Sequence, residues 1–224
     1  MASTFVNNLR LEEMNTGEQS GQWGTKTNTN LELVGEALGF GTEAITTNAN
    51  THATTVADAS SDAGRAIYII YTGTLDSACT ITIGPDTLKR VHIIKNGTSG
   101  SQNILIKQGA GAGAAVTIPP GDTKVVSLDG AGSGAIVTDV YASLSVVDLK
   151  VQDDLSLTSD SAVVSFGVDA DTTLTHTDGS GLTLNSTNKL MFNDASQFIQ
   201  GASATVLDIA ATDTIELTAT NIAV

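Results

Sequence analysis

Three histidines are the residues of this sequence that most often carry general acid–base chemistry or bind metals. His52, His92 and His176 lie far apart, and none has the spacing of a known nucleophile or metal-ligand motif. His92 falls within an apolar strand, where we expect an outward-facing side chain. His176 follows Leu174 by two positions, so several copies of it could converge in an oligomer and bind a metal or an anion. The turn residues 178–179 favour exposure of His176 to solvent instead.

The other candidates for chemistry are a lone cysteine, a glycine-rich run and two acidic pairs. Cys79 lies in an apolar run, which favours a small buried strand residue over a reactive thiol. The run 109–113 is followed by a strand pattern rather than by a helix, so we expect a hairpin tip and not a phosphate-binding loop. The pairs Asp153/Asp154 and Asp169/Asp171 lack the glycine-framed loop of a calcium site. We therefore predict a non-catalytic protein with no cofactor or metal site.

The composition narrows the class of protein. The chain has 224 residues, of which only 15% are charged and 4% aromatic, while its net charge is −14. Such a composition, rich in Thr, Ser, Ala and Gly, is typical of a secreted or particle-borne β protein. The negative charge and the scattered basic residues argue against a nucleic-acid partner. No stretch approaches the ~20 apolar residues of a membrane span, so we expect no membrane insertion.

The last third of the chain is repetitive. From about Asp148 to Val224, short apolar pairs recur about every eight residues between small polar turns. In most units the two apolar residues lie two positions apart, as in Leu182-Thr-Leu184, so they face one way along a short strand. The linking residues are Thr, Asn, Asp, Ser and Gly, which favour turns. This pattern predicts a repetitive β shaft over residues 142–224.

A single copy of this shaft would be too thin to hold a core. Two apolar side chains bury too little surface to offset the entropy of ordering about eight residues. We therefore expect copies of the chain to wrap around a shared axis as an intertwined, β-helical homotrimer. A single-chain β-solenoid is the alternative, although its coils usually need to be longer than this repeat. The residues expected in the trimer core are Leu174, Leu182, Leu184, Leu190, Phe192, Leu207, Ile209, Ile215 and Leu217.

The residue pattern in the middle of the chain is typical of a β domain. Apolar runs separated by Gly, Pro, Asn and Asp recur about a dozen residues apart, which predicts a β-sandwich or jelly-roll-like domain over residues 65–141. The seven runs are 66–71, 79–83, 91–94, 104–106, 116–118, 125–128 and 136–141. The weakly patterned stretch 42–64 is expected to be a linker, with room for a strand near its start.

Residues 1–41 are expected to form an irregular extension with one short helix. The stretch 29–32 has the spacing of a capping box, and Leu31, Val34 and Leu38 fall on one helical face. A helix of about ten residues is marginal alone, so this face must lie on another surface. Trp23, the only tryptophan, is either the core of a small packed unit or a binding anchor.

The opening of the chain also has a recognisable pattern, in which a Trp-Gly step precedes an Asn-x-Asn helix start. The residues that carry it are Phe5-Val-Asn-Asn-Leu-Arg-Leu11, Thr16-Gly17, Gly21-Gln-Trp-Gly24, Asn28, Asn30, Leu33 and Ala37. This pattern resembles the N-terminal segment of phage tail fibres. The stretch 118–130 is similar to the β domain that often follows in those proteins, especially in phages of marine cyanobacteria. The repeat around 174–184 looks like their fibre shaft.

The resemblance implies a trimeric virion protein of the phage tail, made in the host cytoplasm. Its N-terminus would be held by a tail adaptor, nozzle or baseplate protein, and a distal region would reach toward a host envelope receptor. The residues expected at the virion attachment site are Phe5, Leu9, Leu11, Trp23, Gly24, Asn28, Asn30, Leu31, Val34 and Leu38. The repeat runs to Val224 without a distal head, so the chain is a short fibre, is capped by another protein, or is the proximal part of a longer fibre. A capsid-decorating fibre or a carbohydrate-binding surface adhesin is the alternative function.

Overall fold

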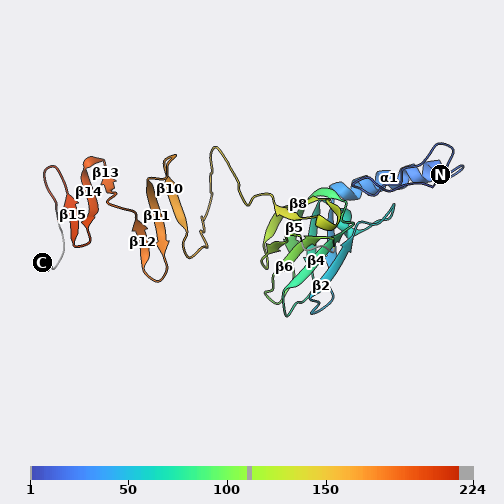
Figure 1. Cartoon of the computed structure of the whole chain (residues 1–224), viewed down its shortest axis with the longest axis horizontal. Helices are drawn as coiled ribbons and strands as arrows, with labels where there is room; N and C mark the ends of the chain where they lie inside the picture. Colours follow the sequence, from blue (N-terminus) through green and yellow to red (C-terminus); the bar gives the residue numbers. More distant parts are fainter. Residues whose placement is uncertain (1, 110–112, 217–224) are drawn as a thin grey trace. The chain divides into compact units, whose positions relative to one another are not determined.

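The computed structural model describes residues 2–109 and 113–216 and divides into two compact units, 1–147 and 148–224. Both units are built from β-strands, and unit 1 also holds the one α-helix of the described residues (Figure 1). The prediction of a mainly β chain with one helix near its start is therefore confirmed. The division between the units lies close to residue 142, where the shaft was expected to begin.

Helix α1 spans Trp23–Leu38, so it begins well before the predicted capping box at 29–32. No side chain caps it at Gln22, the residue that precedes it. The helix ends at Leu38, and the amide of the following Gly39 donates a hydrogen bond to the Glu36 carbonyl oxygen over 3.0 Å. The residues that α1 buries within its own chain are Leu33 and Ala37. The buried face therefore lies beside the predicted apolar face rather than on it.

The first six strands of unit 1 alternate between two sheets. Strands β1 (Phe40–Ala44), β3 (Tyr68–Thr72) and β5 (Lys89–Asn96) run parallel in one sheet, and β2 (Thr51–Thr55), β4 (Cys79–Gly84) and β6 (Ile104–Gln108) run parallel in the other. Gly41 pairs with Ile69 and Ile69 pairs with Ile94, so successive coils are offset by 28 and 25 residues. The chain thus winds as a short solenoid whose coils each contribute one strand to each sheet.

Antiparallel strands close one end of this winding. Strand β7 (Val116–Ile118) pairs with β6, β8 (Thr123–Asp129) pairs with β5, and β9 (Val137–Asp139) pairs with β8. The seven apolar runs predicted as strands are the strands β3 to β9, so that prediction is confirmed.

Two predictions about this domain were wrong. The jelly-roll-like arrangement is replaced by parallel pairing, because the chain crosses to the other sheet after each of its first strands. The range 42–64 is not a linker, since it contains most of β1, all of β2 and the 3₁₀ helix η1 (Ala63–Arg65). The β domain therefore begins at Phe40 rather than at residue 65.

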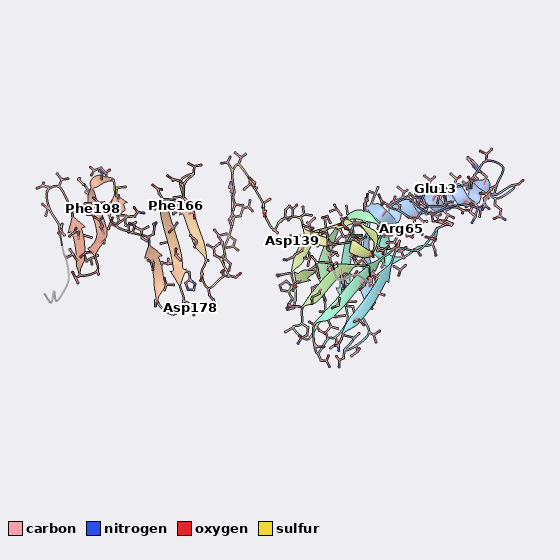
Figure 2. All side chains as sticks on the ribbon, in the orientation of Figure 1. Glu13, Arg65, Asp139, Phe166, Asp178 and Phe198 are labelled. Carbon is pink, nitrogen blue, oxygen red and sulfur yellow. The ribbon has the colours of Figure 1, made fainter. Side chains whose placement is uncertain are left out.

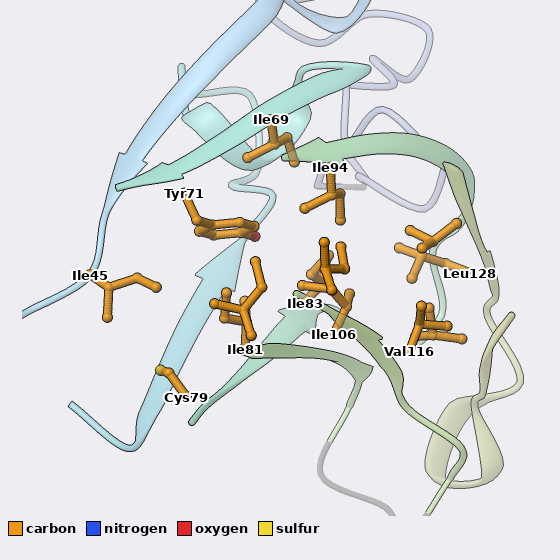
Figure 3. Close-up of a cluster of buried hydrophobic side chains, with 14 of the residues drawn as sticks. Ile45, Ile69, Tyr71, Cys79, Ile81, Ile83, Ile94, Ile106, Val116 and Leu128 are labelled. Carbon is orange, nitrogen blue, oxygen red and sulfur yellow. The ribbon is translucent and has the colours of Figure 1, made fainter. Parts of the chain in front are cut away.

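The two sheets of unit 1 enclose one apolar core. Ile69 and Ile94 extend from the first sheet toward Ile81 and Ile106 of the second (Figure 3). Cys79 is buried in the same cluster, as predicted for a small strand residue. Side chains alternate between the core and the surface along β4 and β6, as the two-residue period of a strand requires. This core lies entirely within one chain.

The turns between the two sheets stack on one another. The amide of Leu75 donates a hydrogen bond to the Ser99 carbonyl oxygen, one coil further on, over 3.0 Å. Gly73 and Gly100 have φ angles of +119° and +96°. A Cβ atom at Gly73 would collide with the carbonyl oxygen of Ile45, and one at Gly100 with that of Leu75. Glycine is therefore required where the coils approach most closely.

Unit 2 contains two three-stranded antiparallel sheets. Strands β10 (Val163–Phe166), β11 (Thr172–Thr177) and β12 (Gly181–Leu184) form the first, and β13 (Leu190–Phe192), β14 (Asp194–Ser203) and β15 (Val206–Ala210) form the second. Each of these strands carries one apolar group of the repeat, so the predicted strands are confirmed over 163–210. Residues 148–162 form no strand. The strands pair as hairpins within one chain, and the intertwining of several copies stays a prediction.

Candidate interaction surfaces

The first sheet of unit 2 has one apolar face. Val164 pairs with Leu174, Leu174 pairs with Leu184, and His176 pairs with Leu182. Directly paired residues point to the same side of a sheet, and residues two apart on a strand share that side. We call this side apolar face 1; it consists of Val164, Phe166, Leu174, Leu182 and Leu184, with His176 among them. The opposite side carries mainly hydroxyl residues, namely Val163, Ser165, Thr173, Thr175, Thr177 and Thr183.

The second sheet repeats this separation. Leu190 pairs with Ile199, which pairs with Ile209, while Leu207 pairs with Gly201 on the same side. We call this side apolar face 2; it consists of Leu190, Phe192, Ile199, Leu207 and Ile209. On the other side, the Lys189 ammonium lies 3.6 Å from the ring centroid of Phe198 and covers that ring. One side of each sheet is therefore mainly apolar, while the other is more polar and carries the exposed apolar residues Val163 and Met191 singly.

Neither apolar face is covered by its own chain. No residue is buried among 148–216, which is the described part of unit 2. Leu182 is 69% exposed and Leu207 is 68% exposed. Soluble monomeric proteins rarely expose contiguous apolar surface of this kind, and a sheet normally buries its apolar face against a second layer. The two faces are therefore candidate interaction surfaces.

Most residues predicted for the trimer core lie on these faces. Leu174, Leu182 and Leu184 are on apolar face 1, while Leu190, Phe192, Leu207 and Ile209 are on apolar face 2. Ile215 follows β15 outside any strand and is exposed, and Leu217 lies outside the described residues. The predicted set omitted Val164, Phe166 and Ile199. The two-residue spacing of Val164 and Phe166 was a usable signal, whereas Ile199 was obscured by its apolar neighbour Phe198.

His176 lies on apolar face 1 rather than in the turn where solvent exposure was expected. Strand β11 continues to Thr177, and the turn begins only at Asp178 (Figure 2). The imidazole is half-buried beside a hollow of about 290 Å³, whose other lining residues are Leu157, Ala162, Val164, Leu174 and Leu182. It is the one titratable side chain that borders this hollow.

Residues 2–22 form an irregular segment, as predicted. Its polar groups hold it to α1, since the Asn30 side chain accepts a hydrogen bond from the Glu12 amide over 3.0 Å and donates one to the Glu12 carbonyl oxygen over 2.9 Å. The Lys26 ammonium lies 3.0 Å from the buried Glu12 carboxylate and lowers its pKa. Asn30 was predicted to belong to the attachment site, and the structure places it in this internal contact.

The other residues predicted for attachment divide into two groups. Phe5, Leu9, Leu11 and Val34 are half-buried within unit 1. Trp23, Gly24, Asn28, Leu31 and Leu38 are exposed, and the exposed fractions are 64% for Trp23, 64% for Leu31 and 76% for Leu38. Three large apolar side chains on a single helix are thus mostly exposed to solvent, which makes α1 a third candidate surface.

A buried polar cluster fixes the end of α1 to the β domain. The Arg65 guanidinium is fully buried and donates hydrogen bonds to the Ala57 and Ser60 carbonyl oxygens and to the Asp62 carboxylate, over 2.6, 2.8 and 3.0 Å. Its Nε atom lies 3.8 Å from the Glu36 carboxylate of α1. Burial raises the pKa of Asp62, against the opposing effects of the Ala57 amide and Arg65. The cluster gives the helix a defined position on unit 1.

His92 is buried next to this cluster, so the expectation of an outward side chain was wrong. Its Nδ1 atom lies 2.9 Å from the Ala66 carbonyl oxygen, which makes Nδ1 the donor and leaves Nε2 without a hydrogen bond inside the described chain. Burial, and then the nearby Arg90 charge, lower the pKa of His92 to about 4. The inward-facing positions of β5 are the even-numbered ones, and the neighbouring Val91 is exposed instead.

Across 2–109 and 113–216 there is no cluster of three or more His, Cys, Asp or Glu that could hold a metal ion. Burial raises the pKa of Cys79, which disfavours its thiolate. A hollow of about 400 Å³ is lined by Thr55, Val56, Ala57, Gly84, Pro85 and the ion pair of Arg10 with Asp58. No helix in the described part of the chain has the length and apolarity needed to cross a bilayer.

Comparisons with known proteins found no counterpart: no family model, no curated protein and no solved structure matches the chain. A functional proposal must therefore start from the three uncovered surfaces, which are apolar face 1, apolar face 2 and the exposed side of α1.

Proposed function

We propose that the chain is the subunit of a homotrimeric tail fibre of a tailed phage, or of its proximal part, with a structural and non-catalytic role. The observation that carries the proposal is that unit 2 presents two apolar sheet faces and buries none of its described residues. Other copies of the chain supply the missing second layer, because a symmetric assembly brings the same face of each copy together. The resemblance to tail fibres favours three copies.

The exposed hydroxyl side of the first sheet is consistent with such a shaft. With a net charge of −14 on each chain, a trimer would carry 3 × −14 = −42. Neutral Thr and Ser on the outer side limit repulsion between the copies, whereas the apolar faces lie inside. Leu184 and Thr183 occupy neighbouring positions on opposite sides of β12, so they separate these two roles within one strand.

The N-terminal part of unit 1 is proposed to attach the fibre to a tail adaptor, nozzle or baseplate protein, with Trp23 as anchor. Trp23 is 64% exposed at the first position of α1, and the preceding segment is tied to the same helix. A large exposed ring on a positioned helix is typical of a binding anchor. The distal end would face the host envelope receptor.

Attachment can be tested on assembled particles. Trp23→Ala should release fibres from particles, because losing a buried aromatic anchor typically costs at least ~2 kcal/mol per site. The released Trp23→Ala protein should still have the native mass of a trimer. Tyr141→Ala is the matched control, since Tyr141 is another exposed aromatic residue of unit 1 but lies outside the N-terminal segment.

Three outcomes would count against the proposal. If native mass measurement gives a folded monomer, the trimeric fibre proposal is wrong. Trp23→Ala fibres that still copurify with tails would exclude Trp23 as the anchor. Association of the unmodified protein with purified capsids rather than tails would support the capsid-decorating alternative.

A further inference from the structure

Helix α1 carries two stripes along its length, and its own chain covers one of them much more fully than the other. The covered stripe consists of Lys26, Asn30, Leu33 and Ala37. Lys26 and Asn30 bind Glu12, while Leu33 and Ala37 are buried. The N-terminal segment and the β domain thus cover this stripe of the helix. That side of the helix has its partner.

The second stripe lies one residue further along the chain and is only partly covered: Thr27 and Val34 are half-buried, whereas the two leucines between and after them are exposed. It consists of Thr27, Leu31, Val34 and Leu38, and we call it the α1 seam. Its successive spacings of four, three and four residues are those of the inner positions of a coiled coil. Leu31 and Leu38 are 64% and 76% exposed. A seam with this spacing fits another helix better than it fits a sheet or an irregular loop.

The residue types on the α1 seam indicate which helix would cover it. None of the four side chains is charged, so like residues can meet around a symmetry axis without repulsion. The Leu residues occupy the a positions, and the β-branched Thr27 and Val34 occupy the d positions. Leu at a with a β-branched residue at d favours more than two helices, whereas the reverse order favours two.

We propose that the α1 seam packs against the same seam of two other copies of this chain, as a short parallel three-helix coiled coil. The inference rests on the proposed trimer and deepens it, since it adds a second self-association surface at the opposite end of the sequence from the shaft. Sixteen residues are marginal for an isolated helix assembly, but linkage through unit 1 and the shaft raises the effective concentration of the three helices. The proposal assigns Leu31, Val34 and Leu38 to other copies and leaves Trp23 and residues 2–22 for the tail protein.

Cysteine cross-linking tests this arrangement in the full chain. Leu31→Cys and Leu38→Cys place a thiol on the α1 seam, and Glu32→Cys places one on an exposed part of the helix away from it. Cys79, the one native cysteine, is buried and does not compete for the reagent. With a short bismaleimide, both seam variants should form covalent dimers on the order of tenfold more efficiently than Glu32→Cys, because their thiols are held together.

Native mass measurement of each variant before cross-linking separates this proposal from the wider one. Trimers that cross-link at Leu31→Cys and Leu38→Cys but not at Glu32→Cys support the three-helix seam. Trimers in which the seam variants cross-link no better than Glu32→Cys overturn the seam while leaving the trimeric fibre intact. A monomer in solution overturns both.

Discussion

The two units of this chain are built from similar short strands, but unit 1 buries the apolar side of its strands and unit 2 leaves it exposed. In unit 1 the strands form two sheets that face each other, and an apolar core from Ile45 to Val137 lies between them. In unit 2 the strands form single-layer sheets, and residues 148–216 contain no buried side chain. A regular apolar pattern predicts strands in both units, but only a second sheet from the same chain, as in unit 1, buries their apolar side without a partner.

The largest expected effect would come from placing a charge on an apolar face of unit 2. Leu184→Asp should abolish assembly of the shaft, because three carboxylates would be buried without partners at a cost on the order of several kcal/mol each. Native mass measurement should then give no ordered shaft trimer. Thr183→Asp is the matched control, since it places the same charge on the opposite side of β12 and should leave assembly intact. Equal assembly of the two variants would show that the face assignment is wrong.

A cavity in the core of unit 1 should have a large effect on that unit alone. Ile81→Ala should lower the free energy of unfolding of unit 1 by about 2–5 kcal/mol, because Ile81 is fully buried and its truncation leaves a cavity in the core. Chemical denaturation followed by the fluorescence of Trp23 or by circular dichroism would measure the change. Val91→Ala, at a half-exposed position of β5, should change it by less than about 0.5 kcal/mol. Loss of the trimer with Ile81→Ala at low temperature would contradict the independence of the two units.

Acid should destabilise unit 1 through His92. The folded chain keeps this imidazole neutral with a pKa of about 4, whereas an unperturbed histidine titrates near 6.5. The contribution of His92 to stability is therefore complete above pH 6.5, falls as the pH drops toward 4, and levels off below 4. The loss should reach about 3 kcal/mol. Melting temperatures of the wild type and His92→Gln, measured between pH 7 and 4, should converge as the pH falls, and parallel curves would exclude this role.

The sequence revealed which segments are strands more readily than how they pair. The apolar runs of β3 to β9 were recognisable, because their residues alternate toward a core. Parallel pairing between residues 25 to 29 positions apart leaves no mark on the local pattern, so the winding could not be predicted. The stretch 42–64 was predicted as a linker with room for one strand near its start, where β1 lies, but β2 was missed. Phe40–Ala44 and Thr51–Thr55 consist mostly of small and polar residues at the edges of their sheets.

The candidate surfaces were predictable to different degrees. Seven residues of the expected trimer core share the two apolar faces, since a two-residue period fixes the side of a strand on which a residue lies. The helix was harder to predict, because Trp23–Asn28 contains weak helix formers and no side-chain cap, so its first turns gave no signal. The burial of His92 was also hidden, since the apolar residues next to it obscured which side of β5 faces the core.

The coil-by-coil winding of unit 1 has a consequence for biosynthesis. Because the parallel strand pairs of the two sheets join residues only 25 to 29 positions apart, these contacts are short-range in sequence for a parallel β structure. Each coil can add to the previous one as the chain leaves the ribosome, and N-terminal domains generally fold first during synthesis. Unit 1 should thus be folded before the apolar faces of unit 2 are translated. Nascent subunits would then meet as tethered, folded domains, and the apolar faces of each chain would emerge only after its unit 1 has folded.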